Sequence, residues 1–189
     1  MNLLLSRTCK LADFPECLSV AEWQQSLADV AWQTWETHEH ARTRRPSLCL
    51  NWSGCPFIAP GAGAIYQYRD QPPNGVTTFH LPAVYGLCVL DHVEAPVRFL
   101  LNATQILRPR GLLFLTFTFW DAEGPDCALG ADRRTRIYDV TALKKLIGES
   151  RRLGFHPFGG VDWEYHGNTL ADHTLASLVL QYRGRPDDD

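Results

Sequence analysis

The clearest hydrophobic pattern in the chain covers residues 84–119 and predicts a strand, a helix and a second strand. Residues 85–90 are nearly all apolar, which is typical of a strand buried on both faces of a parallel sheet. Apolar positions then recur every three or four residues, and Pro96 suits the first turn of such a helix. Its inward-facing positions are predicted to be Val97, Leu100, Leu101, Ile106 and Leu107. Residues 108–111 predict a turn and residues 112–119 a second buried strand, which completes a βαβ unit.

A second helical pattern lies near the N-terminus. Ser19 and Glu22 form a capping-box pair, which marks the start of a helix. Its apolar face is predicted to comprise Val20, Trp23, Leu27, Val30 and Ala31, widened by Trp32 and Trp35. The helix is expected to end in the polar residues before Pro46. The helical spacing favours tryptophans that cover a sheet face, and the alternative is a protein interface, where aromatic residues are enriched.

The region between these two patterns is less regular. Residues 46–83 are rich in proline and glycine, so they exclude a long helix. Short strands are predicted there over residues 47–51, 64–68 and 76–79.

The C-terminal pattern predicts one more helix and two strands. Asp139 or Thr141 is expected to cap the helix, and Gly154 suits the left-handed residue that ends it. Strands are predicted over residues 155–163 and 175–182, where they could pair antiparallel.

Composition places the chain among ordinary globular proteins. Of 189 residues, 45% are hydrophobic and 21% charged, which is sufficient for a buried core. We predict a helical extension over residues 1–45, an α/β domain over residues 46–183 and a disordered acidic tail over residues 184–189. The net charge of −3 leaves no basic excess for nucleic acid. No apolar run reaches the length of a membrane span, and we expect a cytoplasmic protein.

Metal ligands are not evident in the sequence. None of the six cysteines forms a CxxC pair, and His38 and His40 are too close in sequence to share a helix face. We therefore predict no metal site.

Three short motifs follow one another along the second half of the chain. They are LDHV at residues 90–93, LRPRG at residues 107–111 and GF at residues 154–155. Their order and spacing resemble the second half of a class I S-adenosylmethionine-dependent methyltransferase. In that family the fourth strand ends in Leu-Glu-His, and a Leu-Lys/Arg-Pro-Gly-Gly turn precedes the fifth. Asp replaces Glu here and Arg replaces one Gly. The resemblance implies a Rossmann-like methyltransferase-type sheet with an antiparallel strand pair at its C-terminal edge.

The resemblance also implies a site at the carboxyl ends of the parallel strands, where open α/β sheets bind ligands. S-adenosylmethionine is the expected cofactor there, and Leu90 and Asp91 are expected to bind it. Trp120 and Asp121 would contact the methyl acceptor, and His92 would be the catalytic base. The acceptor would be a small molecule or a protein. A histidine bonded to backbone at a helix start is the alternative for His92.

A second cluster of polar residues lies farther along. Residues 162–173 combine carboxylates, imidazoles and aromatic rings. Tyr165 and His166 are our substrate-binding candidates from this cluster, since binding residues concentrate on loops.

The first half of the family pattern is harder to find. The family binds its cofactor with a glycine-rich loop after the first strand and an acidic residue after the second. Gly61 and Gly63 are the candidates for the loop, and Asp70 is the nearest acidic residue. No helical pattern follows Gly63, so an irregular loop without a ligand is the alternative. The chain between Gly63 and His92 is also too short for two further strands with their helices. The first half of the fold is therefore expected to be truncated or degenerate.

Two functions follow from these observations. The chain is either a compact methyltransferase, or a degenerate protein of that fold that acts as a binding or structural module in a larger assembly. The second function would require a protein partner or a homo-oligomer.

Overall fold

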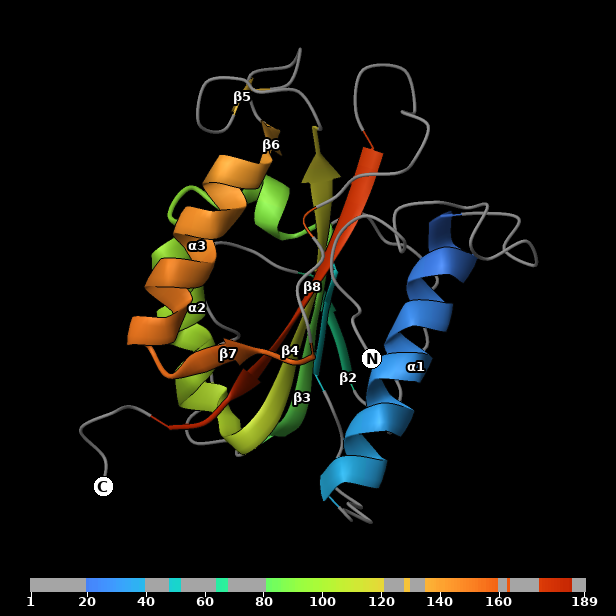
Figure 1. Ribbon diagram of the computed structural model, residues 1–189. Helices are drawn as coiled ribbons and strands as arrows, with labels where there is room; N and C mark the ends of the chain where they lie inside the picture. The colour runs from blue at the N-terminus through green and yellow to red at the C-terminus, as the bar shows by residue number, and fades with distance from the viewer. Residues whose placement is uncertain are drawn as a thin grey trace.

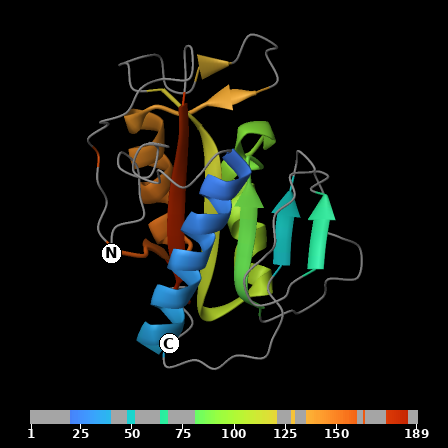
Figure 2. The same ribbon diagram turned by 90° about the vertical axis from the view of Figure 1, so that its right-hand side faces the viewer.

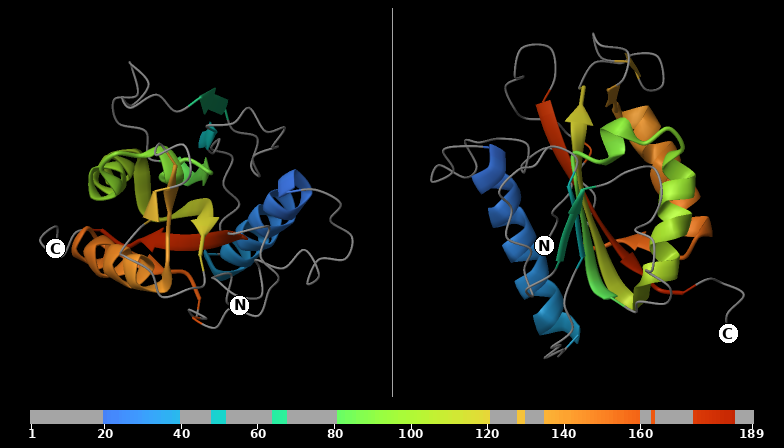
Figure 3. Two further views of the ribbon diagram at one scale, coloured as in Figure 1. Left: turned by 90° about the horizontal axis from the view of Figure 1, so that it is seen from above. Right: turned by 180° about the vertical axis from the view of Figure 1, so that it is seen from behind.

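The computed structural model describes residues 20–39, 48–51, 64–67, 81–120, 128–129, 135–159, 163 and 174–184. They form three layers, in which a six-stranded sheet separates one long helix from two shorter ones (Figure 1). Helix α1 (Val20–Glu39) lies on one face of the sheet. Helices α2 (Pro96–Ile106) and α3 (Val140–Arg152) lie on the other face, as the view from behind also shows (Figure 3). The predicted α/β class is confirmed.

The sheet has the strand order β2-β1-β3-β4-β8-β7. Its strands are β1 (Leu48–Asn51), β2 (Ala64–Gln67), β3 (Leu81–Leu87), β4 (Leu107–Phe119), β7 (Phe155–Pro157) and β8 (Thr174–Tyr182). The first four strands in this order are parallel, and three of them stand side by side in Figure 2. Strand β8 runs antiparallel to both of its neighbours, which confirms the predicted C-terminal pair. The short strands β5 (Ala128–Leu129) and β6 (Arg136–Ile137) form a separate ribbon.

Two hydrophobic cores lie on the two faces of the sheet. Strand β4 contributes side chains to both cores, because successive residues of a strand point to opposite faces. Phe114 packs toward α1, whereas Leu113 and Leu115 pack toward α2 and α3. In the core beneath α1, the helix contributes Trp23, Trp32 and Trp35, all buried. These tryptophans therefore cover a sheet face, as the helical spacing predicted.

Several predicted boundaries were wrong. Strand β3 covers residues 81–87 instead of 85–90, and residues 108–111 belong to β4 instead of forming a separate turn. Val97 was predicted to face inward but is 42% exposed. The space beside β3 is filled by the Phe99 ring instead, which approaches Gly86 closely. Strand β7 ends at Pro157, well before the predicted residue 163.

Other predictions for the helices were correct. Helix α1 has the expected position, and α2 begins at Pro96. The Asp139 side chain caps α3, since its Oδ1 accepts a hydrogen bond from the Ala142 amide at 2.7 Å. Gly154 follows α3 with a left-handed φ of 83°.

The close approach at Gly86 gives a stability prediction. A Cβ at this position would lie 2.8 Å from Leu115 Cδ2 and 3.6 Å from Phe99 Cζ. We expect Gly86→Ala to lower the free energy of unfolding by about 1–3 kcal/mol through overpacking, measured by denaturant titration. Gly148→Ala on α3 is the control, because nothing lies within 4 Å of the position that its new methyl group would take. That variant should gain about 0.5–1 kcal/mol from the lower flexibility of alanine. A loss of equal size in both variants would contradict the packing argument.

Candidate functional site

The strand order reverses between β1 and β3. Strand β2 follows β1 in sequence and pairs on one side of it, whereas β3 pairs on the other side. This reversal is a topological switch point, and ligands of open α/β sheets bind outside the carboxyl ends of the strands at such a point. The carboxyl ends of β1 and β3 are Asn51 and Leu87, which are in register with each other. The candidate site therefore lies at this edge, the upper one in Figure 2.

Residues 88–93, which we call the exit turn, carry the chain away from β3. Cys88 begins the turn with a left-handed φ of 51°, which is uncommon for a residue with a side chain. Its amide donates to the Thr116 carbonyl at 3.0 Å and to Thr116 Oγ1 at 3.1 Å. The exit turn is therefore fixed to the neighbouring strand β4 at its first residue.

Asp91 attaches a second position of the exit turn to β4. Its side chain is 3% exposed, its Oδ1 accepts a hydrogen bond from the Thr118 amide and its Oδ2 accepts one from Thr118 Oγ1, both at 2.8 Å. Burial raises the pKa of this carboxyl from 3.8 to about 7, although the two hydrogen bonds from Thr118 act in the opposite direction. Asp91 is thus a carboxyl close to half-protonated near neutral pH.

The exit turn offers few of its side chains to a ligand. Val89, Leu90, Asp91 and Val93 are buried, while Cys88 and His92 are partly exposed. The His92 amide donates to the Val89 carbonyl at 3.0 Å. An imidazole can accept a proton from a bound molecule when the two lie within hydrogen-bond reach.

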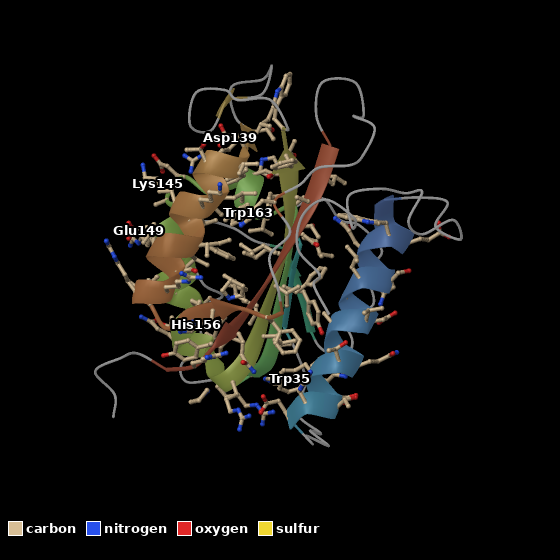
Figure 4. The ribbon with its side chains drawn as sticks, in the orientation of Figure 1. Trp35, Asp139, Lys145, Glu149, His156 and Trp163 are labelled. Atoms are coloured by element: carbon tan, nitrogen blue, oxygen red, sulfur yellow. The ribbon has the colours of Figure 1, made fainter. Side chains whose placement is uncertain are left out.

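The neighbouring strand end is held by the segment before α3. Trp120 directly follows β4, its side chain is half-buried, and its amide donates to the Tyr138 carbonyl at 2.8 Å. The Tyr138 hydroxyl donates to the Leu90 carbonyl at 3.3 Å. The segment that leads to Asp139 at the start of α3 therefore bridges the ends of β3 and β4 (Figure 4). Trp120 and the exit turn therefore lie at the same edge of the sheet.

Several predicted site residues fall outside the described residues, namely Gly61, Gly63, Asp121, Tyr165 and His166. The described strands bound the segment that contains these glycines. Strand β1 ends at Asn51, and β2 begins at Ala64. Gly54 is the first glycine after β1 in the sequence, and Gly61 and Gly63 are the last two before β2.

The structure shows polar residues that the sequence prediction missed. Gln24, Thr116, Thr118 and Tyr138 are buried and hold the carboxyl edge together. Thr116 and Thr118 could have been found, because they interrupt an apolar strand at alternate positions. Gln24 likewise lies on the helix face of Leu27 and Ala28.

The described residues offer neither a metal site nor a membrane span. In this part of the chain, no group of three or more histidine, cysteine or acidic side chains could hold a metal ion. None of the described helices is both long and apolar enough to cross a bilayer.

The fold is that of known methyltransferases. The [4+2]-cyclase SpnF superimposes with a TM-score of 0.54 at 12% identity, over 86% of this chain and 83% of that one. Geranyl diphosphate C-methyltransferase from Streptomyces coelicolor superimposes with a TM-score of 0.52 at 8% identity, over 89% of this chain and 85% of that one. An O-methyltransferase of a polyketide synthase from Brevibacillus brevis superimposes with a TM-score of 0.50 at 10% identity, over 82% of this chain and 72% of that one. No family model and no curated protein matches the sequence. The likeness establishes the methyltransferase-type fold.

Proposed function

We propose that this protein binds S-adenosylmethionine at the carboxyl edge of its sheet and transfers the methyl group to an acceptor. The observation that carries the proposal is the switch point between β1 and β3, with the exit turn beside it. Two of the similar structures, both named as methyltransferases, contain S-adenosylhomocysteine.

The residues at this edge fit a ligand of that kind. Hydrogen bonds with Thr116, Thr118 and Tyr138 fix the exit turn in the absence of a ligand, and ligand sites are usually preformed. The Asp91 carboxylate is already engaged by Thr118 and the Leu90 side chain is buried, so we assign their cofactor contacts to the main chain.

The strand positions suggest two further cofactor residues. The resemblance places a glycine after the first strand and an acidic residue after the second. In this chain Gly54 follows the end of β1, and Asp70 follows the end of β2. We propose these two residues in preference to Gly61 and Gly63.

The chemistry requires an oriented acceptor and a base. S-adenosylmethionine supplies an activated methyl group when it is bound. His92 would take the proton of the acceptor, and Trp120 with Asp121 would orient the acceptor at the end of β4. Tyr165 and His166 remain candidates for the outer part of the same pocket.

Calorimetric titration of S-adenosylmethionine tests the proposal. We expect binding in the micromolar range and, at a hundredfold excess over Kd, a stabilisation of about 2.7 kcal/mol. For a chain of this size that corresponds to a rise in Tm of roughly 5–10 °C. ATP is the control, since it shares the adenosine but lacks the methionine. Hydrogen exchange should slow in residues 88–93 on binding and stay unchanged at the far end of α3. No heat and no shift in Tm at millimolar ligand would contradict the proposal.

The alternative is a module without catalysis. Residues 68–80 join β2 to β3, and they are too few for the third strand and two helices that the family has there. This shortened first half favours a degenerate site. The same titration separates the two functions, because a degenerate module would bind neither ligand. A partner protein or a second copy of the chain would then be the molecule that it binds.

A further inference from the structure

Gln24 of α1 is a buried polar residue on an apolar helix face. It is 2% exposed, and its neighbours Trp23 and Leu27 on the same helix belong to the core between α1 and the sheet. Burial of an amide is costly unless it is hydrogen-bonded. Its Nε2 donates to Thr116 Oγ1 at 2.9 Å and contacts Cys88 Sγ at 3.4 Å. The partners of Gln24 are therefore the first residue of the exit turn and the β4 residue that holds it.

Thr116 connects three elements at this point. Leu87 pairs with Thr116 in the β3–β4 ladder, so Cys88 is the first residue beyond that ladder. The Thr116 hydroxyl oxygen accepts from the Cys88 amide as well as from Gln24, and it lies 3.8 Å from Cys88 Sγ. A left-handed backbone at a residue with a side chain costs on the order of 1–3 kcal/mol and persists only where its surroundings fix it. These contacts provide that constraint for Cys88.

We propose that Gln24 is a positioning residue, which holds Cys88 through Thr116 and thereby fixes the exit turn that carries His92. Helix α1 would then be part of the site, although it is distant in sequence from β3 and β4. The link from the exit turn to cofactor binding rests on the function proposed above. A satisfied core amide that merely sets the position of α1 is the competing explanation.

Gln24→Met tests the positioning role without any ligand, because methionine has a similar volume but cannot donate a hydrogen bond. Amide hydrogen exchange measured by mass spectrometry should be about tenfold faster in residues 88–93, the effect of losing one hydrogen bond of about 1.4 kcal/mol. Glu39→Gln is the control, since Glu39 anchors the opposite end of α1 through Arg110. It should leave exchange in the exit turn unchanged. Equal exchange in the Gln24→Met and wild-type exit turns overturns the proposal.

Two further measurements keep the outcomes distinct. In a double-mutant cycle, Gln24→Met and Thr116→Val should affect exit-turn exchange less than additively, because they remove the same bond. Fully additive effects overturn the connection through Thr116. If the wild type binds S-adenosylmethionine, Gln24→Met should weaken the Kd by about tenfold, equivalent to that same bond. An unchanged Kd would overturn the link to the cofactor. A wild type that binds no S-adenosylmethionine refutes the proposed function, and the exchange experiment still decides the role of Gln24.

Discussion

Replacement of Trp35 by alanine is expected to lower the free energy of unfolding by about 3–5 kcal/mol, the range for loss of a large buried aromatic side chain. Trp35 is fully buried between α1 and the sheet, near the lower end of the helix (Figure 4). Its Nε1 donates to the Arg110 carbonyl at 2.7 Å. The Trp32 ring centroid lies 5.1 Å away, and the Arg108 guanidinium lies 5.2 Å from the Trp35 ring. Denaturant titration and the Tm, which should fall by roughly 10 °C, provide the measurement.

Two variants separate packing from hydrogen bonding. Trp35→Phe keeps an aromatic ring but removes the donor, and part of the loss is offset because Gln181 also donates to the Arg110 carbonyl at 3.3 Å. We expect a cost of about 1 kcal/mol for the missing bond, together with some cost for the smaller ring. Gln33→Ala changes an exposed position on the same helix and should stay within about 0.5 kcal/mol of the wild type. If Trp35→Ala were as mild as Gln33→Ala, α1 would be a loosely attached extension instead of a layer of the core.

The stability of the protein should fall as the pH rises from about 4 to about 7, because of Asp91. Burial raises the pKa of this carboxyl in the folded protein to about 7, against 3.8 as its ordinary value. Between these two pH values the folded state keeps the proton on Asp91, whereas the unfolded state has released it. The stabilisation is therefore complete below about pH 4 and is lost as the pH rises to about 7. At 1.36 kcal/mol per pH unit the total loss is up to about 4 kcal/mol. Urea titrations across this pH range measure it.

Asp91→Asn should remove this contribution to the pH dependence. The amide can accept from the Thr118 amide and donate to the Thr118 hydroxyl, so the shape of the contact is kept. We expect the variant to match the wild type near pH 4 and to exceed its stability by up to about 4 kcal/mol at pH 8. Thr118→Val removes the hydroxyl that favours the charged form of Asp91, so the loss of stability should end at a higher pH. Thr118→Ser keeps a hydroxyl and should leave the pH profile unchanged. An identical pH profile in wild type and Asp91→Asn would refute this role for Asp91.

Local patterns predicted the helices well, because these elements carry strong local signals. The buried face of α1 follows from tryptophans and leucines at helical spacing, and α3 follows from the Asp139 cap and Gly154. Errors arose where tertiary contacts decide the outcome. The boundary between the helix and β4 is one example, since residues 108–111 join the strand through the irregular pairing around Pro82. Val97 is another, because helical spacing alone does not show that Phe99 fills the neighbouring space.

The contacts around the candidate site could not be predicted from the sequence. LDHV located the exit turn beside β3, yet the sequence could not show that Asp91 accepts two hydrogen bonds from Thr118, a residue of the next strand. The contribution of Gln24 depends on a contact between residues far apart in the chain. Such contacts follow from the packing of α1 on the sheet and leave no local signal.

The bond between Gln181 of β8 and Glu39 of α1, 3.1 Å long, joins residues 142 positions apart. Such long-range contacts slow folding, because the loop between the partners must close before the contact can form. Helix α1 also meets Val179 of β8, so its docking face is completed only after the last described strand has been synthesised. During translation the tryptophans of α1 would be exposed on the nascent chain until then. We therefore expect α1 to dock late in folding, after a transient state in which its apolar face is exposed.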